Sequence, residues 1–294
     1  ARRRQGDRII RAERLFSGEH IHRPFAVCDR WMRKPSVVYS GKEVVGAMAG
    51  YERSAHLYDL FDSKENIPFF LSYAEGRGQI LDVGAGTGRI AIPLAEHGAH
   101  VVCVEPSAAM RRVFEWKLTD SPHLRERIEL VPADAFSFDL SRTFPTVTMS
   151  GVFDHFLDGE QRLAALRNTV RHLAPGGLLV FDVFLGMMGS APLSPAGRVQ
   201  DGDWTYRRFV AREVLPEDRV NVRLVYETWR EGKLVGRIEE NSLVGITSRE
   251  EIHRLLDDVG AVVVNEFSDY DKAPYREADE LLIVEAVRRT RSRE

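Results

Sequence analysis

The stretch "ILDVGAGTGRIAIPLAEHG", residues 80–98, decides the fold class of this sequence. It opens with an apolar run, continues with Gly84, Gly86 and Gly88 at alternate positions, and resumes as an amphipathic helix. Glycine lets a ligand approach the main chain closely, and the N–H groups at a helix N-terminus point outward toward such a ligand. The stretch therefore predicts a ligand-binding turn between a buried strand and a helix.

The hundred residues around this turn alternate between apolar strands and helices. Strands are expected at 79–85, 100–106, 128–135, 146–156 and 178–184. Ser107 is placed to cap the helix after the second strand, and "APGG" stops the helix before the fifth. Alternation of this kind predicts a parallel sheet with helices on both faces.

The pattern changes after residue 184. Residues 186–197 are rich in Gly, Pro and Ser and are expected to form a loop, and three antiparallel strands follow at 204–214, 219–230 and 233–247. A helix and two strands return from 248. We expect four parts: a basic arm at 1–40, a core with N-terminal cap helices at 41–184, an antiparallel β insertion at 185–247, and the C-terminal part of the core at 248–294.

Composition narrows the class of protein. The chain has 294 residues, 44% of them hydrophobic and 29% charged, with a net charge of −3. Two cysteines are too few for a disulfide framework, and no apolar run reaches the roughly 18 residues of a membrane span, so we expect a cytoplasmic protein without a membrane. The histidines do not pair with cysteines or acids in a metal-ligating pattern, and we expect no metal. Residues 1–34 carry a net charge of +6, which is typical of an arm that binds nucleic acid or another anionic partner. No interleaved aromatic residues or RNA-binding module accompany the charge, so a solvated or partner-packing helix is the favoured interpretation.

Two acids sharpen the interpretation of the glycines. The G-x-G-x-G spacing differs from the G-x-G-x-x-G of dinucleotide-binding dehydrogenases, which makes a nicotinamide enzyme the weaker alternative. Asp82 lies two residues before the first glycine, and Glu105 ends the next strand, where an acid can accept hydrogen bonds from both ribose hydroxyls. With these residues the chain resembles the class I S-adenosylmethionine-dependent methyltransferases over about residues 50–288.

The resemblance implies a fold, a cofactor and a cofactor site. The fold is a Rossmann-like seven-stranded α/β sheet whose last strand, "ELLIVEAV", is antiparallel, with the β insertion between strands five and six. The cofactor is S-adenosylmethionine, which leaves as S-adenosylhomocysteine, with Glu105 at its ribose and Asp134 at its adenine amino group. The residues implied in this site are Asp82, Gly84, Ala85, Gly86, Gly88, Glu105, Pro106, Met110, Asp134, Ala135 and Ser150.

Within that family the sequence is similar to small-molecule N-methyltransferases that act on amino sugars and glycine-like amines. "LYDLF" places Tyr58 in a helix that covers the cofactor in those enzymes, and "MSGVFDHF" matches a loop whose histidine, here His155, reaches the acceptor. A histidine just past the fourth strand can remove the acceptor's proton. The alternatives are a surface histidine and a tyrosine that packs between helices.

Fewer residues support a prediction of the site that binds the methyl acceptor. Asp182 could hold an acceptor's amine or be a solvated strand-end carboxylate, and the aromatic residues could wall the acceptor pocket or belong to the core. The insertion is expected to form that wall and to contribute to a homodimer. Methylation of RNA or protein, and cofactor binding without catalysis, remain the alternative functions. The candidate acceptor residues are Asp182, Phe153, Phe156, Trp204 and Tyr206.

Overall fold

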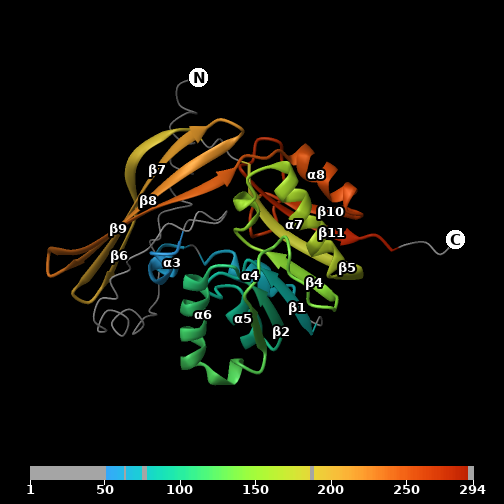
Figure 1. Ribbon diagram of the computed structural model, residues 1–294, viewed down its shortest axis with the longest axis horizontal. Helices are drawn as coiled ribbons and strands as arrows, with labels where there is room; N and C mark the ends of the chain where they lie inside the picture. Colours follow the sequence, from blue (N-terminus) through green and yellow to red (C-terminus); the bar gives the residue numbers. More distant parts are fainter. Residues whose placement is uncertain (1–50, 63, 75–77, 186–188, 291–294) are drawn as a thin grey trace.

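The computed structural model describes residues 51–62, 64–74, 78–185 and 189–290. They form a seven-stranded sheet with helices on both faces and a separate four-stranded antiparallel sheet (Figure 1), which confirms the expected Rossmann-like α/β class. The basic arm expected at 1–40 lies outside the described residues. The strands of the main sheet are β1 (Gln79–Val83), β2 (His100–Val104), β3 (Ile128–Val131), β4 (Phe144–Met149), β5 (Leu173–Phe184), β10 (Ala261–Phe267) and β11 (Leu281–Arg288).

The order of the strands in the main sheet is β10-β11-β5-β4-β1-β2-β3. Strands β1 to β5 are parallel, whereas β11 runs antiparallel to both β5 and β10. This reversed last strand confirms the implied topology, and it differs from the dinucleotide-binding fold, whose sixth strand continues the parallel sheet. The carboxyl ends of β1, β2, β4 and β5 therefore meet at one edge, where ligands bind in open α/β sheets.

Helices cover both faces of the main sheet. Helices α4 (Ile67–Leu71), α5 (Ala91–Glu96) and α6 (Ala108–Asp120) pack on one face, and α7 (Gly159–Arg171) and α8 (Arg249–Asp258) pack on the other. Helix α6 begins at Ser107, whose Oγ accepts a hydrogen bond from the Met110 N–H at 3.1 Å, as expected of a capping serine. Among the described residues, no helix is both long enough and apolar enough to cross a membrane.

The second sheet corrects one expectation. It has four strands in chain order, β6 (Ala191–Asp201), β7 (Trp204–Leu215), β8 (Arg219–Arg230) and β9 (Lys233–Gly245). The expected loop at 186–197 was therefore wrong from Ala191 onward. Strand β6 is an edge strand with irregular register at Ala191/Ser194 and Pro195/Gly197. Prolines and glycines are tolerated at such edges because only one side of the strand needs N–H donors.

Helix α3 (Ala55–Phe61) lies between the two sheets (Figure 1). Leu57 and Leu60 pack against Tyr206 and Tyr226 of the four-stranded sheet. On its other side, α3 packs against Met110 and other apolar residues of α6. Of the cap helices expected at the start of the core, the described residues 51–62 contain α3. The helix therefore joins the insertion to the edge of the main sheet that carries the glycine turn.

Candidate functional site

The glycine turn follows β1 directly and is shaped by close packing. An added Cβ at Gly84 would lie 2.3 Å from Val152 Cγ2, and one at Gly88 would lie 2.4 Å from the Phe114 ring. At Gly86, whose φ is +56°, an added Cβ would meet nothing within 4 Å. Two of the glycines are therefore required by their neighbours, and Gly86 leaves its backbone facing open space.

Two buried carboxylates stand beside this turn. Glu105 accepts hydrogen bonds from the Gly86 N–H at 2.9 Å and the Ser107 N–H at 2.7 Å. Asp82 accepts one from Thr148 Oγ1 at 2.9 Å, and burial raises its pKa to about 6. Burial also raises the pKa of Glu105. Each carboxylate still has lone pairs that its protein donors do not use, so both can accept hydrogen bonds from a ligand.

A small cavity opens at this turn. A larger groove runs along α8 and the edge strand β10, away from the glycine turn. We place the site at the smaller cavity because a bare backbone and polar side chains converge there. Six of the expected site residues line it: Tyr58, Asp82, Gly84, Ala85, Gly86 and Ser150.

Other expected cofactor residues do not line this cavity. Met110 packs between α6 and α3, and Ala135 belongs to the core beneath the sheet. The Pro106 carbonyl accepts a hydrogen bond from Arg111. Asp134 accepts hydrogen bonds from the N–H groups of the two residues Phe136 and Ser137, so its carboxylate stabilises its own turn. Their proposed contacts with the cofactor remain predictions.

His155 lies in the short 3-10 turn η2 (Phe153–His155), just beyond β4. Its ring is half-buried and lies edge-on to Tyr51, with the ring centroids 6.1 Å apart. Burial lowers the pKa of His155 below its ordinary value, and a hydrogen bond to the Leu243 backbone opposes this only in part. The imidazole is therefore neutral at pH 7, which is the form that can accept a proton.

Tyr58 lies on the cavity side of α3. Its ring meets Tyr51 edge-on, with centroids 5.1 Å apart, and its hydroxyl is hydrogen-bonded to Asp62. The Asp62 carboxylate and burial raise the pKa of Tyr58, so its hydroxyl stays protonated. Tyr51 thus bridges Tyr58 and His155, the two catalytic candidates.

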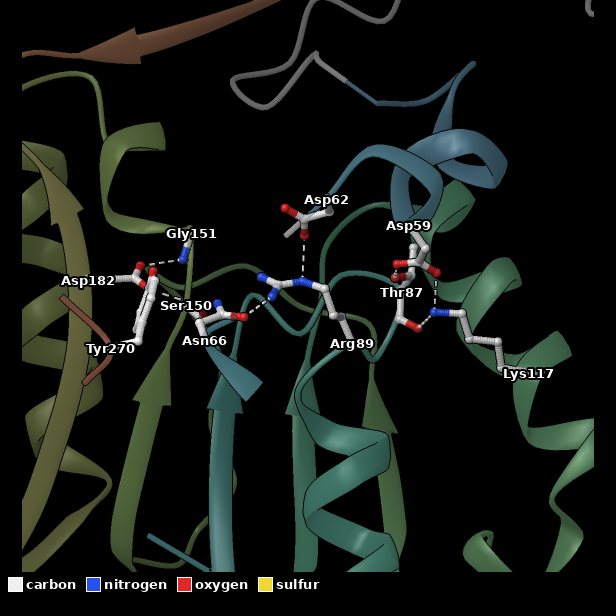
Figure 2. Close-up of polar contacts among 10 residues, drawn as sticks. All are labelled: Asp59, Asp62, Asn66, Thr87, Arg89, Lys117, Ser150, Gly151, Asp182 and Tyr270. Carbon is white, nitrogen blue, oxygen red and sulfur yellow. Dashed lines mark hydrogen bonds and ion pairs between the residues drawn. The ribbon is translucent and has the colours of Figure 1, made fainter. Parts of the chain in front are cut away.

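The structure gives Asp182 protein partners for its carboxylate. It accepts hydrogen bonds from the Gly151 N–H at 2.6 Å, the Tyr270 hydroxyl at 2.9 Å and Ser150 Oγ at 3.2 Å (Figure 2). The side chain is buried, so the interpretation as a solvated carboxylate was wrong. These donors favour a structural role, in which Asp182 holds the loop that leads to His155.

The expected aromatic wall is mostly interior. Phe153 and Phe156 are fully buried, with Phe153 stacked on Phe181 at 4.9 Å, so both belong to the core as the alternative held. Tyr206 is buried against α3, and Trp204 is half-buried at the edge of the same cluster.

Sequence reasoning missed the charged residues that fasten α3 to the glycine turn. Figure 2 shows Arg89 between Asp62 and Asn66, and Lys117 beside Asp59. One signal was present in "LYDLFD": two acids, Asp59 and Asp62, lie at the end of the expected helix. What those acids meet could not be deduced from spacing.

Comparison with known proteins identifies the class of domain. Residues 81–179 match the family model of a methyltransferase domain. The cypemycin N-terminal methyltransferase of a Streptomyces species is 38% identical over 104 residues, which cover 35% of this chain and 40% of that protein. An uncharacterized methyltransferase of Bacillus cytotoxicus matches over 64% of its length. The chain thus spans less than two thirds of these relatives.

Solved structures share the fold over most of the chain. The CcbJ methyltransferase of Streptomyces caelestis has a TM-score of 0.68 at 16% identity, covering 81% of this chain and 97% of that one. The sugar N-methyltransferase KedS8 of a Streptoalloteichus species has 0.64 at 24%, covering 87% and 100%. The amino pentose methyltransferase CalS10 of Micromonospora echinaspora, solved with S-adenosylmethionine bound, has 0.62 at 20%, covering 80% and 95%. The described chain shares the fold of S-adenosylmethionine-dependent methyltransferases, and residues 81–179 match a methyltransferase domain.

Proposed function

We propose that the protein transfers the methyl group of S-adenosylmethionine to a nitrogen atom of a small-molecule acceptor. The observation that carries the proposal is the cavity at the glycine turn, where an open backbone at Gly86 meets Asp82 and Arg89. The methionine end of the cofactor bears a carboxylate, an ammonium and a sulfonium. One cationic and one anionic side chain on the cavity wall fit this pattern of charges. CalS10, which shares the fold and was solved with S-adenosylmethionine bound, supports this choice of cofactor.

The cofactor residues have distinct proposed roles. Glu105 directly follows β2, and its buried carboxylate lies beside Gly86, which suits it to the two ribose hydroxyls. Asp82 can accept hydrogen bonds from the ammonium group. The main chain from Gly84 to Gly86 lets the ligand approach without a side chain in the way. Asp134 remains proposed for the adenine amino group.

His155 is the proposed base. When bound, the cofactor supplies an electrophilic methyl group on a positively charged sulfur. An attacking amine must lose a proton, and His155 is neutral at pH 7 and lies past the carboxyl end of β4. Tyr51 and Tyr58 stand beside it and can fix the orientation of the acceptor, which supplies much of the catalysis in an in-line displacement.

Nitrogen is favoured over oxygen as the acceptor atom. Two neighbours that share the fold are described as a sugar N-methyltransferase and an amino pentose methyltransferase. The cypemycin enzyme, which is similar over 104 residues, is described as an N-terminal methyltransferase. Its description adds a second acceptor class, an amino terminus. Both classes present an amine, and the four-stranded sheet beside α3 is the proposed wall around it.

The experiment measures release of S-adenosylhomocysteine from S-adenosylmethionine over a panel of acceptors. The panel pairs amino sugars, glycine-like amines and short peptides with counterparts in which a hydroxyl replaces the amine, and an acetylated peptide controls for the amino terminus. We expect turnover with an amine and none with its hydroxyl counterpart. Turnover confined to the hydroxyl counterparts, or to an RNA added to the panel, would overturn the proposal. Cofactor binding without turnover on any member would favour a non-catalytic binding protein.

A further inference from the structure

Helix α3 and its C-terminal cap bring two carboxylates to the glycine turn. Asp59 lies within the helix, whereas Asp62 follows the last helical residue, Phe61, and has an extended backbone (Figure 2). Asp59 is ion-paired with Lys117 of α6 and accepts a hydrogen bond from Thr87 Oγ1 at 2.6 Å. Asp62 is paired with Arg89 instead. The two acids therefore hold the same helix to different cations.

The ion pair of Asp62 differs from that of Asp59 because its cation, Arg89, lines the cavity. Arg89 Nε lies 2.5 Å from Asp62 Oδ2, and the side chains are only 12% and 26% exposed. A second donor of Arg89 is hydrogen-bonded to Asn66 Oδ1. Of the described residues that line the cavity, Arg89 is the only cation. Lys117 does not line it, so the two ion pairs are not equivalent toward a ligand.

The proposed cofactor needs this cation. Its α-carboxylate requires a positive partner when it leaves water, because a buried unpaired charge is costly. Asp62 already neutralises Arg89. Burial raises the pKa of Asp62, and the Arg89 guanidinium beside it opposes this rise only in part.

We propose that Arg89 binds the α-carboxylate of the cofactor, and that Asp62 competes with that carboxylate for Arg89. This rests on the proposed function, since it assigns the residue that recognises the methionine end. Arg89 exchanges an internal carboxylate on α3 for one on the ligand. Asp62 thus lowers the affinity for the cofactor and holds α3 to the glycine turn until the cofactor is bound.

Competition predicts that removing the charge of Asp62 makes cofactor binding tighter. If Asp62 only stabilised the fold, the same substitution would leave binding unchanged or weaken it. Asp62→Asn keeps the shape and a hydrogen-bonding oxygen but removes the charge. We expect it to bind S-adenosylhomocysteine roughly 5- to 30-fold more tightly than the wild type, because the carboxylate that competes for Arg89 is removed. Affinity for 5′-methylthioadenosine, which lacks the amino-acid end, stays within about twofold. Both are measured by isothermal titration calorimetry on the full chain.

Asp59→Asn is the matched control, since it weakens the other attachment of the same helix. We expect its affinity for S-adenosylhomocysteine to change less than about threefold. Equal tightening in both variants would mean that loosening α3 is the cause, which overturns competition. Unchanged or weaker binding of S-adenosylhomocysteine by Asp62→Asn also overturns it while leaving the proposed function standing. A wild type that binds neither ligand overturns both.

Discussion

The glycine turn and the four-stranded sheet lie on opposite sides of α3, and they are built by different contacts. At the turn, Asp82, Gly86 and Glu105 lie within 24 residues of sequence, and the Gly86 N–H donates a hydrogen bond to the Glu105 carboxylate. On the other side, Glu240 of β9 accepts a hydrogen bond from Ser54, 186 residues away. Local chain geometry thus builds the proposed cofactor side, and long-range packing builds the proposed acceptor side. Substitutions on the two sides should therefore have separable effects.

The largest expected effect is on the acceptor side. His155→Asn should lower turnover by about 10²- to 10⁴-fold with the acceptor that the panel yields, because it removes the base. Affinity for S-adenosylhomocysteine should stay within about twofold. In the wild type, turnover should fall as His155 is protonated, and the lowered pKa puts this acid limb below pH 6.5. The rate of S-adenosylhomocysteine release, measured against pH for both proteins, tests this prediction. If the affinity for S-adenosylhomocysteine fell by as large a factor as the turnover, His155 would belong to the cofactor side.

The next effect concerns the stability of the turn. Gly88→Ala should lower the free energy of unfolding by about 3 kcal/mol, because the new Cβ meets the Phe114 ring and the left-handed backbone is strained. Gly86→Ala should cost only about 1 kcal/mol, since its Cβ meets open space. In the other sheet, Gly236→Ala has ordinary contacts and should change stability by less than about 0.5 kcal/mol. Urea denaturation of the three variants measures this, and equal losses would contradict the packing argument.

Glu105→Ala should weaken S-adenosylhomocysteine binding by about 1.5–3 kcal/mol, the loss of a charge-assisted pair of hydrogen bonds. Because Glu105 also accepts hydrogen bonds from Gly86 and Ser107, Glu105→Gln is the control that retains an acceptor oxygen. Calorimetry should place the glutamine variant between the other two. Identical affinities in all three proteins would remove Glu105 from the ribose site.

The smallest expected effect separates the two faces of the insertion. Trp204 shares a face with Tyr206 toward α3, whereas the register of β7 and β8 puts Trp229 on the opposite face. Trp204→Ala should raise the acceptor KM about fivefold with S-adenosylhomocysteine affinity intact. Trp229→Ala should leave both constants unchanged. Sedimentation velocity on both variants tests the proposed homodimer, and a shift to monomer in Trp229→Ala alone would place the dimer contact on that outer face.

Features that depend on neighbours in the sequence could be predicted. The strand–turn–helix at residues 80–98, the alternation behind the parallel sheet and the Ser107 cap are all confirmed. Ser248 and Glu251 have the spacing of a capping box, in which each residue's side chain bonds the other's backbone N–H, and one of these two bonds is present. Ser248 Oγ accepts from the Glu251 N–H, but the Glu251 carboxylate binds Arg162 and Thr247 instead.

The sequence by itself determined the α/β class and the positions of Asp82, the three glycines and Glu105, because periodicity and turn chemistry act over a few residues. Only the tertiary structure decided that β6 becomes an edge strand, that Phe153 and Phe156 are core residues, and that Arg89 is paired with Asp62. Each of these depends on a partner brought close by folding. Contacts between residues distant in sequence are set by packing and burial, and no local pattern encodes which partner arrives.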